Sequence, residues 1–327
     1  MTAPHNEISG NGPTISLTGG LGNQLFQLSV ALANSCSGEV YLEWSLGSPR
    51  LSAELEPELL QFKLPQEIKL LPKRKVSLLQ RKFGNLALRI GAVSKQTNHK
   101  LSPQNLVRFL AKLLLEVTYT GKIKTFIPRG VGFDLTIFDR SLNEGFLVGY
   151  FQSNIWAESP RAQSILKELK LINEVEWIKE CQKWSVIDQP LVLHLRMGDY
   201  VGEDRIGIPR LEYYENAVRE MWSKNIYKKI WIFSDDPTRA EAILSQWILN
   251  EARWMTGNQE SAATTLEVMR YGKGYVLSNS TFSWWGAFLS YNPNAEVVAP
   301  DPWFKLWDEP LNLTPKHWVR RAAWEYD

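Results

Sequence analysis

Three apolar runs in the second half of the chain each end in a cluster of polar residues, and this repeated order is what most constrains the fold. The runs span 190–193, 229–233 and 275–277, and they lead into the clusters His194–Asp199, Ser234–Asp236 and Ser278–Gly286. Helical patterns separate them at 211–223, 238–247 and 263–272. Strands that alternate with helices predict a parallel α/β domain from about residue 185 onward. Because parallel strands bring their carboxyl ends to one edge, where ligands bind, we expect the three clusters to form one site.

The first half of the chain opens with the same order of elements. A strand pattern at 14–18 is followed by the turn Gly19-Gly20-Leu21-Gly22-Asn23-Gln24, an apolar helical pattern and a second strand at 40–42. A further strand at 145–153 has a polar end, and a helical stretch follows from about 160 to 184. The turn lacks the third glycine of the dinucleotide fingerprint, where Leu25 stands, and this disfavours an NAD-dependent oxidoreductase.

The length of 327 residues fits two domains of about 150 residues each. We predict a disordered segment over 1–13, an N-terminal Rossmann-like domain over 14–184 and a C-terminal Rossmann-like domain over 185–327. The composition, 44% hydrophobic and 22% charged, is that of a globular protein. The first 13 residues lack an apolar signal core, and Cys36 and Cys181 are the two cysteines. We therefore expect a reducing, cytoplasmic location.

A basic segment at 68–115 interrupts the first domain. It holds 11 Lys and Arg residues and no Asp or Glu. Apolar residues recur in it at helical spacing: Val76, Leu79, Phe83, Leu86, Ile90, Leu106, Leu110, Leu113 and Leu114. Two interpretations remain open: basic amphipathic helices that contact an anionic membrane surface, or inserted core helices with a solvated basic face. Nucleic acid is disfavoured as a partner, because no binding motif accompanies the segment.

The polar clusters carry groups suited to a nucleoside diphosphate. Arg196 offers a rigid guanidinium for phosphate, and the helix that starts after Ser280 offers hydroxyls and amides. Phe282 or Trp284 can stack on a base or a sugar, and carboxylates can accept from guanine. The structural alternatives are an Arg196–Asp199 ion pair, a core role for His194, a turn-capping role for Asp199, a helix cap at Asp235-Asp236-Pro237, and core packing of Trp284 and Trp285.

Five motifs occur in one order along the chain. They are Gly19–Gln27, Gly149–Ser153, His194–Tyr200, Phe233–Asp236 and Ser280–Ala287. Over residues 14 to about 305, the chain resembles the family-11 glycosyltransferases, the α-1,2-fucosyltransferases that use GDP-L-fucose. The resemblance implies an α/β fold of the GT-B type, with two facing Rossmann-like domains that contain parallel sheets. It also implies an inverting mechanism and no metal or other cofactor.

The resemblance further implies a set of site residues. Catalytic contacts are expected from Arg196, which would hold the diphosphate, and from Asn23. Donor contacts are expected from Gly22, His194, Asp199, Asp235, Asp236, Glu267, Ser280, Thr281 and Phe282. Acceptor contacts are expected from Tyr150 and Gln152, and we add Trp44 and Trp156 as candidates for stacking on a sugar. The residues do not identify a general base.

Two positions depart from the family pattern. Met197 stands where many relatives carry a second Arg, so that Arg196 would hold the phosphate charge largely alone. Thr265-Leu266-Glu267-Val268-Met269 stands where Asp-Leu-x-Leu-Met is expected, which leaves Glu267 or Asp235 to recognise guanine.

The expected function is transfer of L-fucose to the 2-hydroxyl of a terminal β-galactoside in O-antigen or surface polysaccharide synthesis. The acceptor could be lipid-linked, at the inner face of a bacterial plasma membrane. The alternatives are α-1,3 or α-1,6 fucosyl transfer, and a non-catalytic, membrane-associated carbohydrate-binding protein.

Overall fold

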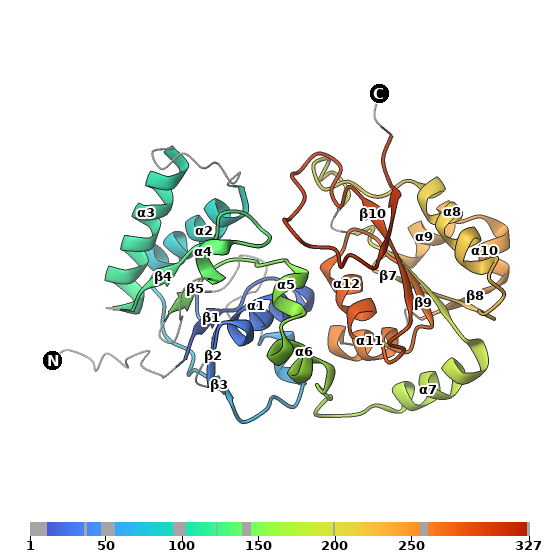
Figure 1. Ribbon diagram of the computed structural model, residues 1–327, viewed down its shortest axis with the longest axis horizontal. Helices are drawn as coiled ribbons and strands as arrows, with labels where there is room; N and C mark the ends of the chain where they lie inside the picture. The colour runs from blue at the N-terminus through green and yellow to red at the C-terminus, as the bar shows by residue number, and fades with distance from the viewer. Residues whose placement is uncertain are drawn as a thin grey trace. The chain divides into compact units, whose positions relative to one another are not determined.

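The computed structural model describes residues 12–35, 38–46, 56–93, 103–121, 123–138, 145–198, 200–255 and 261–325 (Figure 1). The chain divides into two compact units. Unit 1 comprises Met1–Lys170 with Pro310–Leu313, and unit 2 comprises Leu171–Glu309 with Thr314–Asp327. The predicted N-terminal segment falls mostly on residues 1–11, which lie outside the described residues, as do Cys36 and Asp199.

The division between the units lies at Lys170 and not at 184. The helical stretch expected over 160–184 is two helices, α6 (Pro160–Lys167) and α7 (Glu176–Asp188). Helix α7 packs against α11 (Ala262–Met269) of unit 2 and therefore belongs with the second sheet. Sequence periodicity alone does not show which sheet a helix covers.

Unit 1 is built on a five-stranded sheet in the order β3-β2-β1-β5-β4. The strands are short: β1 (Thr14–Ser16), β2 (Val40–Glu43), β3 (Ile68–Leu70), β4 (Thr125–Phe126) and β5 (Phe146–Leu147). All of the described pairs are parallel, and Thr14 lies between Tyr41 of β2 and Phe146 of β5. Ile68–Leu70 pairs with Val40–Leu42 as a strand, so the segment from 68 is not helical from its start.

The helical elements of unit 1 follow from their apolar spacing. They are α1 (Leu21–Ala33), η1 (Glu58–Gln61), α2 (Leu78–Val93), α3 (Pro103–Leu115), η2 (Glu116–Thr120), α4 (Leu135–Phe138), α5 (Asn154–Ala157) and α6. Helix α1 is apolar and buried along most of its length, as expected for a helix enclosed on several sides. Helices α2 and α3 lie side by side and form a smaller core around Leu88 and Leu115.

Unit 2 is built on a six-stranded parallel sheet in the order β11-β10-β9-β6-β7-β8. The strands are β6 (Leu191–Leu195), β7 (Ile230–Ser234), β8 (Ala252–Trp254), β9 (Gly274–Val276), β10 (Glu296–Asp301) and β11 (Val319–Ala322). Counted along the chain from β6, this order is 3-2-1-4-5-6, the order of the Rossmann fold. Every residue of β6 and β7 is buried, as expected of central parallel strands covered on both faces.

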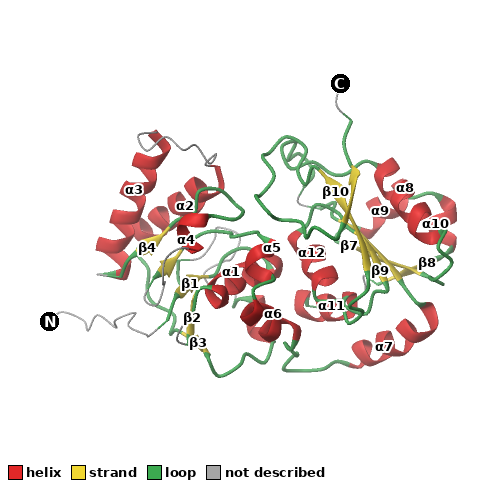
Figure 2. Cartoon of the chain, in the orientation of Figure 1, coloured by secondary structure: helices red, strands yellow, loops and turns green. Residues whose placement is uncertain are grey.

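Helices pack along both faces of this sheet (Figure 2). Those of unit 2 are α7, α8 (Leu211–Trp222), α9 (Pro237–Ile243), α10 (Gln246–Asn250), α11 and α12 (Thr281–Phe288). The single helix predicted over 238–247 is divided into α9 and α10, because Leu244 is extended and buried in the core. The prediction of an α/β protein with two parallel sheets is confirmed.

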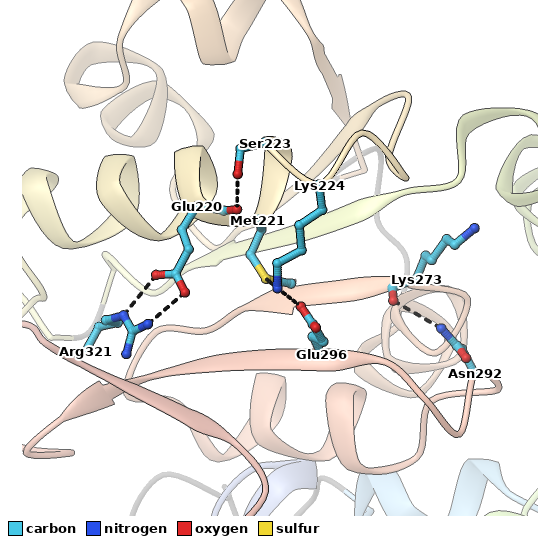
Figure 3. Close-up of polar contacts among 8 residues, drawn as sticks. All are labelled: Glu220, Met221, Ser223, Lys224, Lys273, Asn292, Glu296 and Arg321. Carbon is cyan, nitrogen blue, oxygen red and sulfur yellow. Dashed lines mark hydrogen bonds and ion pairs between the residues drawn. The ribbon is translucent and has the colours of Figure 1, made fainter.

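Two ion pairs tie α8 to the edge of the sheet (Figure 3). Glu220 of α8 accepts two hydrogen bonds from the Arg321 guanidinium of β11, at 2.7 and 2.9 Å. Lys224, two residues after the end of α8, pairs with Glu296 of β10. The hydrogen bond from Arg321 lowers the pKa of Glu220. Because the side chains of both ion pairs are partly exposed, we expect each pair to contribute little to the stability of the fold.

Candidate active site

The carboxyl ends of β6 and β9 form the point in unit 2 where the strand order reverses. From β6 the chain proceeds outward through β7 and β8, and from β9 it proceeds the other way through β10 and β11. Ligands of such sheets bind in the crevice at this point. Two of the three predicted polar clusters start here, after neighbouring strands, since Leu193 of β6 pairs with Val276 of β9. The third follows β7, which lies on the other side of β6.

His194 joins the ends of β6 and β9. Its Nδ1 lies 2.7 Å from Oγ of Ser278, and both residues are buried. Its ring lies 6.1 Å from the Phe282 ring, centroid to centroid. Burial, and then the charge of Arg196, lowers the pKa of His194 to about 3. His194 is therefore neutral, and its contact with Ser278 links the ends of the two strands. Ser278 is not among the predicted site residues.

The buried His194 predicts a stability that depends on pH. The pKa is near 6.5 in the unfolded chain and about 3 in the folded one, so only the unfolded state takes up the proton between these values. The contribution is complete above about pH 6.5 and is lost as the pH falls toward 3, by about 1.4 kcal/mol per unit. Urea unfolding at about pH 7 and about pH 5 should show this slope. The slope should shrink in His194→Asn and persist in His317→Asn, a change at an exposed histidine.

Arg196 is held by a carboxylate from the neighbouring strand. Leu195 of β6 pairs with Ser234 of β7, and one residue further Nε of Arg196 lies 3.2 Å from Oδ2 of Asp235. Arg196 thus pairs with Asp235, whereas the sequence suggested Asp199 as its partner. Asp199 lies outside the described residues. The side chain of Arg196 is 31% exposed, so the guanidinium is oriented and still accessible.

Asp235 also fixes the loop that follows Arg196. It accepts hydrogen bonds from the backbone N–H groups of Met197, at 2.7 Å, and Gly198, at 3.0 Å. A Cβ on residue 198 would lie 2.7 Å from Oδ2 of Asp235, which explains the glycine. Met197 itself packs in the core, so the position at which relatives carry a second Arg points into the core in this chain.

Helix α12 starts at the same edge. Ser280 caps it by accepting a hydrogen bond from the Phe282 N–H, at 3.3 Å, and the first turn contains no acidic residue. Thr281 and Phe282 are partly buried in that turn. Tyr200 connects this turn to Arg196: its OH lies 3.4 Å from the Asn279 carbonyl, and its ring lies 5.7 Å from the guanidinium carbon. The positive end of α12 is thus available to an anion near Arg196.

Unit 1 brings together two motifs that lie far apart in the sequence. Nε2 of Gln152, after β5, donates to Oδ1 of Asn23 in α1 at 2.9 Å. Gln27, one helical turn after Asn23, accepts from the Thr18 N–H and donates to the Gly149 carbonyl, both at 2.9 Å. Gln27 is fully buried and positions both turns. The signal for it is a glutamine four positions after Asn23, which places both residues on one side of a largely buried helix.

The amino end of α1 differs from that of α12. Oε2 of Glu58 accepts a hydrogen bond from the Leu21 N–H at 2.6 Å. Gly22 is buried inside the first turn of this helix. A carboxylate from the protein thus already neutralises the positive end of α1, and α12 is the better phosphate site of the two.

Two of the residues expected to contact the donor already interact with other parts of the protein. Asp236 caps α9 by accepting from the Arg239 N–H at 3.1 Å, which confirms the helix-cap alternative for one of the two aspartates. Glu267 of α11 pairs with Nη1 of Arg270 at 2.8 Å and also accepts from the Tyr291 hydroxyl. Both carboxylates therefore have structural roles.

The candidate acceptor residues differ in their accessibility. Trp156 is fully buried, with its ring 4.8 Å from that of Phe133, so this indole has no face for a sugar and the expectation for it is wrong. Trp44 and Tyr150 are partly buried after β2 and β5, at the carboxyl edge of the sheet, and Gln152 lies at the same edge. Trp284 and Trp285 are fully buried, as the core-packing alternative predicts.

A cavity of about 460 Å³ lies beside the unit 2 site, lined in part by Tyr200, Gly207, Arg239 and Trp324. It adjoins the loop after Arg196 but does not include His194, Arg196 or Ser280. Within the described part of the chain, no group of three His, Cys, Asp or Glu residues could hold a metal ion. Among the same residues, no helix is both long enough and apolar enough to cross a membrane.

A sheet in Rossmann order, with an arginine and a capped helix at its switch point, is typical of α/β proteins that bind phosphorylated nucleotides. The particular family is given by comparison with known proteins. The chain belongs to glycosyl transferase family 11, whose model matches residues 137–319, more than half of its length.

Two curated relatives from Escherichia coli are similar to this chain. The O-antigen biosynthesis glycosyltransferase WbnK is 24% identical over 328 residues, which cover 93% of this chain and 98% of WbnK. An alpha-1,2-colitosyltransferase is 29% identical over 137 residues, which cover 39% of this chain and 46% of the relative.

Solved structures of fucosyltransferases also match. The fucosyltransferase NodZ from Bradyrhizobium matches with a TM-score of 0.46 at 11% identity, over 86% of this chain and 94% of NodZ. POFUT1 in complex with GDP-fucose matches with a TM-score of 0.43 at 15% identity, over 87% of this chain and 96% of POFUT1.

Proposed function

We propose that this family-11 glycosyltransferase moves L-fucose from GDP-β-L-fucose to the 2-hydroxyl of a terminal β-galactoside, with inversion at the fucosyl carbon. The observation that carries the proposal is the Arg196 guanidinium, oriented by Asp235, at the switch point next to the start of α12. WbnK, an O-antigen biosynthesis glycosyltransferase, supports O-antigen or surface polysaccharide synthesis as the setting.

Unit 2 is the proposed donor-binding unit. In the reaction, the bond from the fucosyl carbon to the β-phosphate oxygen breaks, the acceptor oxygen bonds to that carbon, and the proton of the acceptor hydroxyl is released to solvent. Negative charge then grows on the departing GDP. Arg196, with the hydroxyls and amides of Ser280 and Thr281, would stabilise that charge. Each charge-assisted hydrogen bond is worth about 1.5–3 kcal/mol.

The nucleoside would lie against the uncharged side chains of His194 and Phe282. His194 and Phe282 form the apolar wall there, with ring centroids 6.1 Å apart. A neutral His194 does not compete with Arg196 for the phosphate charge. Both candidate carboxylates for a guanine contact have partners within the protein, but the side chain of Asp235 is 22% exposed and that of Glu267 is 11% exposed, so Asp235 is the more accessible of the two. Asp199 remains a predicted donor contact.

Unit 1 is the proposed acceptor-binding unit in the GT-B arrangement that the family resemblance implies. The amide pair Asn23–Gln152 would contact the sugars, with Tyr150 and Trp44 as flanking aromatic side chains. The side chain of Trp44 is partly buried, so part of its ring stays accessible for stacking on a sugar. Asn23 is proposed to orient the attacking hydroxyl.

A colitose donor is the second candidate, because one relative is an alpha-1,2-colitosyltransferase. The deciding experiment supplies the full chain with GDP-L-fucose or GDP-linked colitose and a panel of β-galactosides. Mass spectrometry and linkage analysis then read the product. We expect the mass gain of one fucosyl residue and an α-1,2 linkage to galactose.

Three other outcomes would contradict the proposal. An α-1,3 or α-1,6 linkage would reassign the acceptor hydroxyl, and a product from the colitose donor alone would reassign the sugar. Absence of product, together with no slow release of fucose from GDP-fucose, would favour a non-catalytic carbohydrate-binding protein.

A further inference from the structure

Helix α3 has an apolar face that points into solvent. Five large hydrophobic side chains occupy that face at the helical spacing i, i+3, i+4, i+7 and i+11, which places them along one stripe. We call them the α3 stripe; they are between 44% and 74% exposed: Leu106, Phe109, Leu110, Leu113 and Val117. The last of them lies in η2, which continues α3.

The α3 stripe is not the side of α3 that packs against the protein. That side carries Ala111 and Leu115, which are fully buried against α2. At 100° per residue, Phe109 and Ala111 lie on roughly opposite sides of the helix. A helix on the surface of a globular protein normally presents polar residues outward, whereas α3 is apolar on both sides.

This exposure is concentrated in one region of the fold. Of the twenty large hydrophobic side chains that are exposed among the described residues, nine lie between Leu78 and Val117. Single exposed hydrophobic residues are ordinary on protein surfaces, but a contiguous group of them marks a contact surface.

Positive charge accompanies the stripe. The sequence from 68 to 115 holds no Asp or Glu, and six of its basic side chains are exposed in α2 and the segment before it: Lys69, Lys73, Lys75, Arg81, Lys82 and Arg89. Within the described part of the chain, no carboxylate forms an ion pair with the three of these that lie in α2. The surface around α2 and α3 is therefore apolar and cationic.

We propose that α2 and α3 seat this protein on the surface of an anionic lipid bilayer. The α3 stripe enters the boundary between headgroups and acyl chains, and the basic residues of α2 contact acidic headgroups. A second copy of the same face is a poor occupant, because pairing would bring two sets of positive charges together. The proposal rests on this surface alone and does not depend on the identity of the donor or acceptor sugar.

The test is co-sedimentation of the full chain with vesicles. Phosphatidylcholine vesicles are compared with vesicles that also contain phosphatidylglycerol, at low and high salt. We expect recovery in the pellet only with phosphatidylglycerol, and a strong decrease near 1 M salt, where the screening length is about 3 Å. Equal recovery with both vesicles would overturn the proposal.

Matched variants separate the two components of binding. The pair Phe109→Ser and Leu113→Ser should lower the vesicle affinity at least about tenfold, since each removes a buried apolar contact with lipid. Replacing Arg81, Lys82 and Arg89 by Gln should lower it by about 10- to 100-fold. The control pair Val186→Ser and Ile187→Ser removes hydrophobic side chains of α7 that are more exposed than Phe109 and Leu113, and it should leave binding unchanged.

Folding and self-association are read in parallel. All the variants should keep the thermal midpoint of the parent, because the replaced side chains are exposed. Unchanged vesicle binding by the Phe109 and Leu113 variant would overturn the proposal. So would a dimer in solution that this variant dissociates without any loss of lipid binding.

Discussion

Arg196→Ala is expected to lower the turnover of fucosyl transfer at least about 100-fold, with the fold intact. The guanidinium lies at the switch point of unit 2 and combines a full positive charge, an orientation fixed by Asp235 and an accessible side chain. The diphosphate of GDP-fucose is charged before the reaction, and one further negative charge develops on it as the bond to fucose breaks, so kcat should fall in addition to any rise in KM. Steady-state kinetics with saturating GDP-fucose measures it.

Companion variants distinguish the role of Arg196 from a general loss of charge. Arg196→Lys should recover little activity, because an ammonium cannot reproduce the planar guanidinium and loses the Nε contact with Asp235. Asp235→Asn should lower activity less than Arg196→Ala, since it loosens the orientation but keeps the charge. Arg321→Ala removes the cation of an exposed ion pair in the same unit and should leave kinetics unchanged. Near-normal kinetics for a folded Arg196→Ala protein would contradict the role.

The sequence was sufficient to predict the strands that organise the site. Runs such as 190–193 and 229–233 are continuous apolar stretches because β6 and β7 are covered on both faces, and this makes them recognisable without any alternation. Because parallel strands end at one edge of a sheet, their polar ends could also be predicted to form one site. Strands of two or three residues, such as β3 and β4, are too short for such a pattern, and they are defined by their pairing with β2 and β5.

Side-chain partners were harder to predict than strands. Asp199 lies three residues after Arg196 in the sequence, but the described partner is Asp235, which the register between β6 and β7 brings beside Arg196. The meeting of Gln152 with Asn23 depends in the same way on β5 lying next to β1. Trp156 was misassigned because residue type alone does not tell a core tryptophan from one that stacks on a sugar.

Substitution of Glu267 is expected to have the second large effect, and this effect is on stability more than on donor binding. Its carboxylate pairs with Arg270, and the two side chains are only 11% and 3% exposed. Removing one partner of a buried ion pair leaves the other charge without compensation, at a cost of about 3–5 kcal/mol. We expect Glu267→Ala to lower the free energy of unfolding by about that amount. Urea unfolding measures it, with Glu220→Ala at an exposed pair as the control that loses less than about 1 kcal/mol.

A double variant decides between the structural role of Glu267 and recognition of guanine. Replacing the pair together, Glu267→Leu with Arg270→Met, should recover most of the lost stability, because no uncompensated charge remains. If Glu267 only supports α11, the recovered protein keeps the KM for GDP-fucose of the parent. If Glu267 instead accepts from the guanine edge, KM rises at least about tenfold in the stable double variant, as expected when a hydrogen bond to a charged group is lost. Because Arg270 and Tyr291 already engage the carboxylate, we expect the unchanged KM.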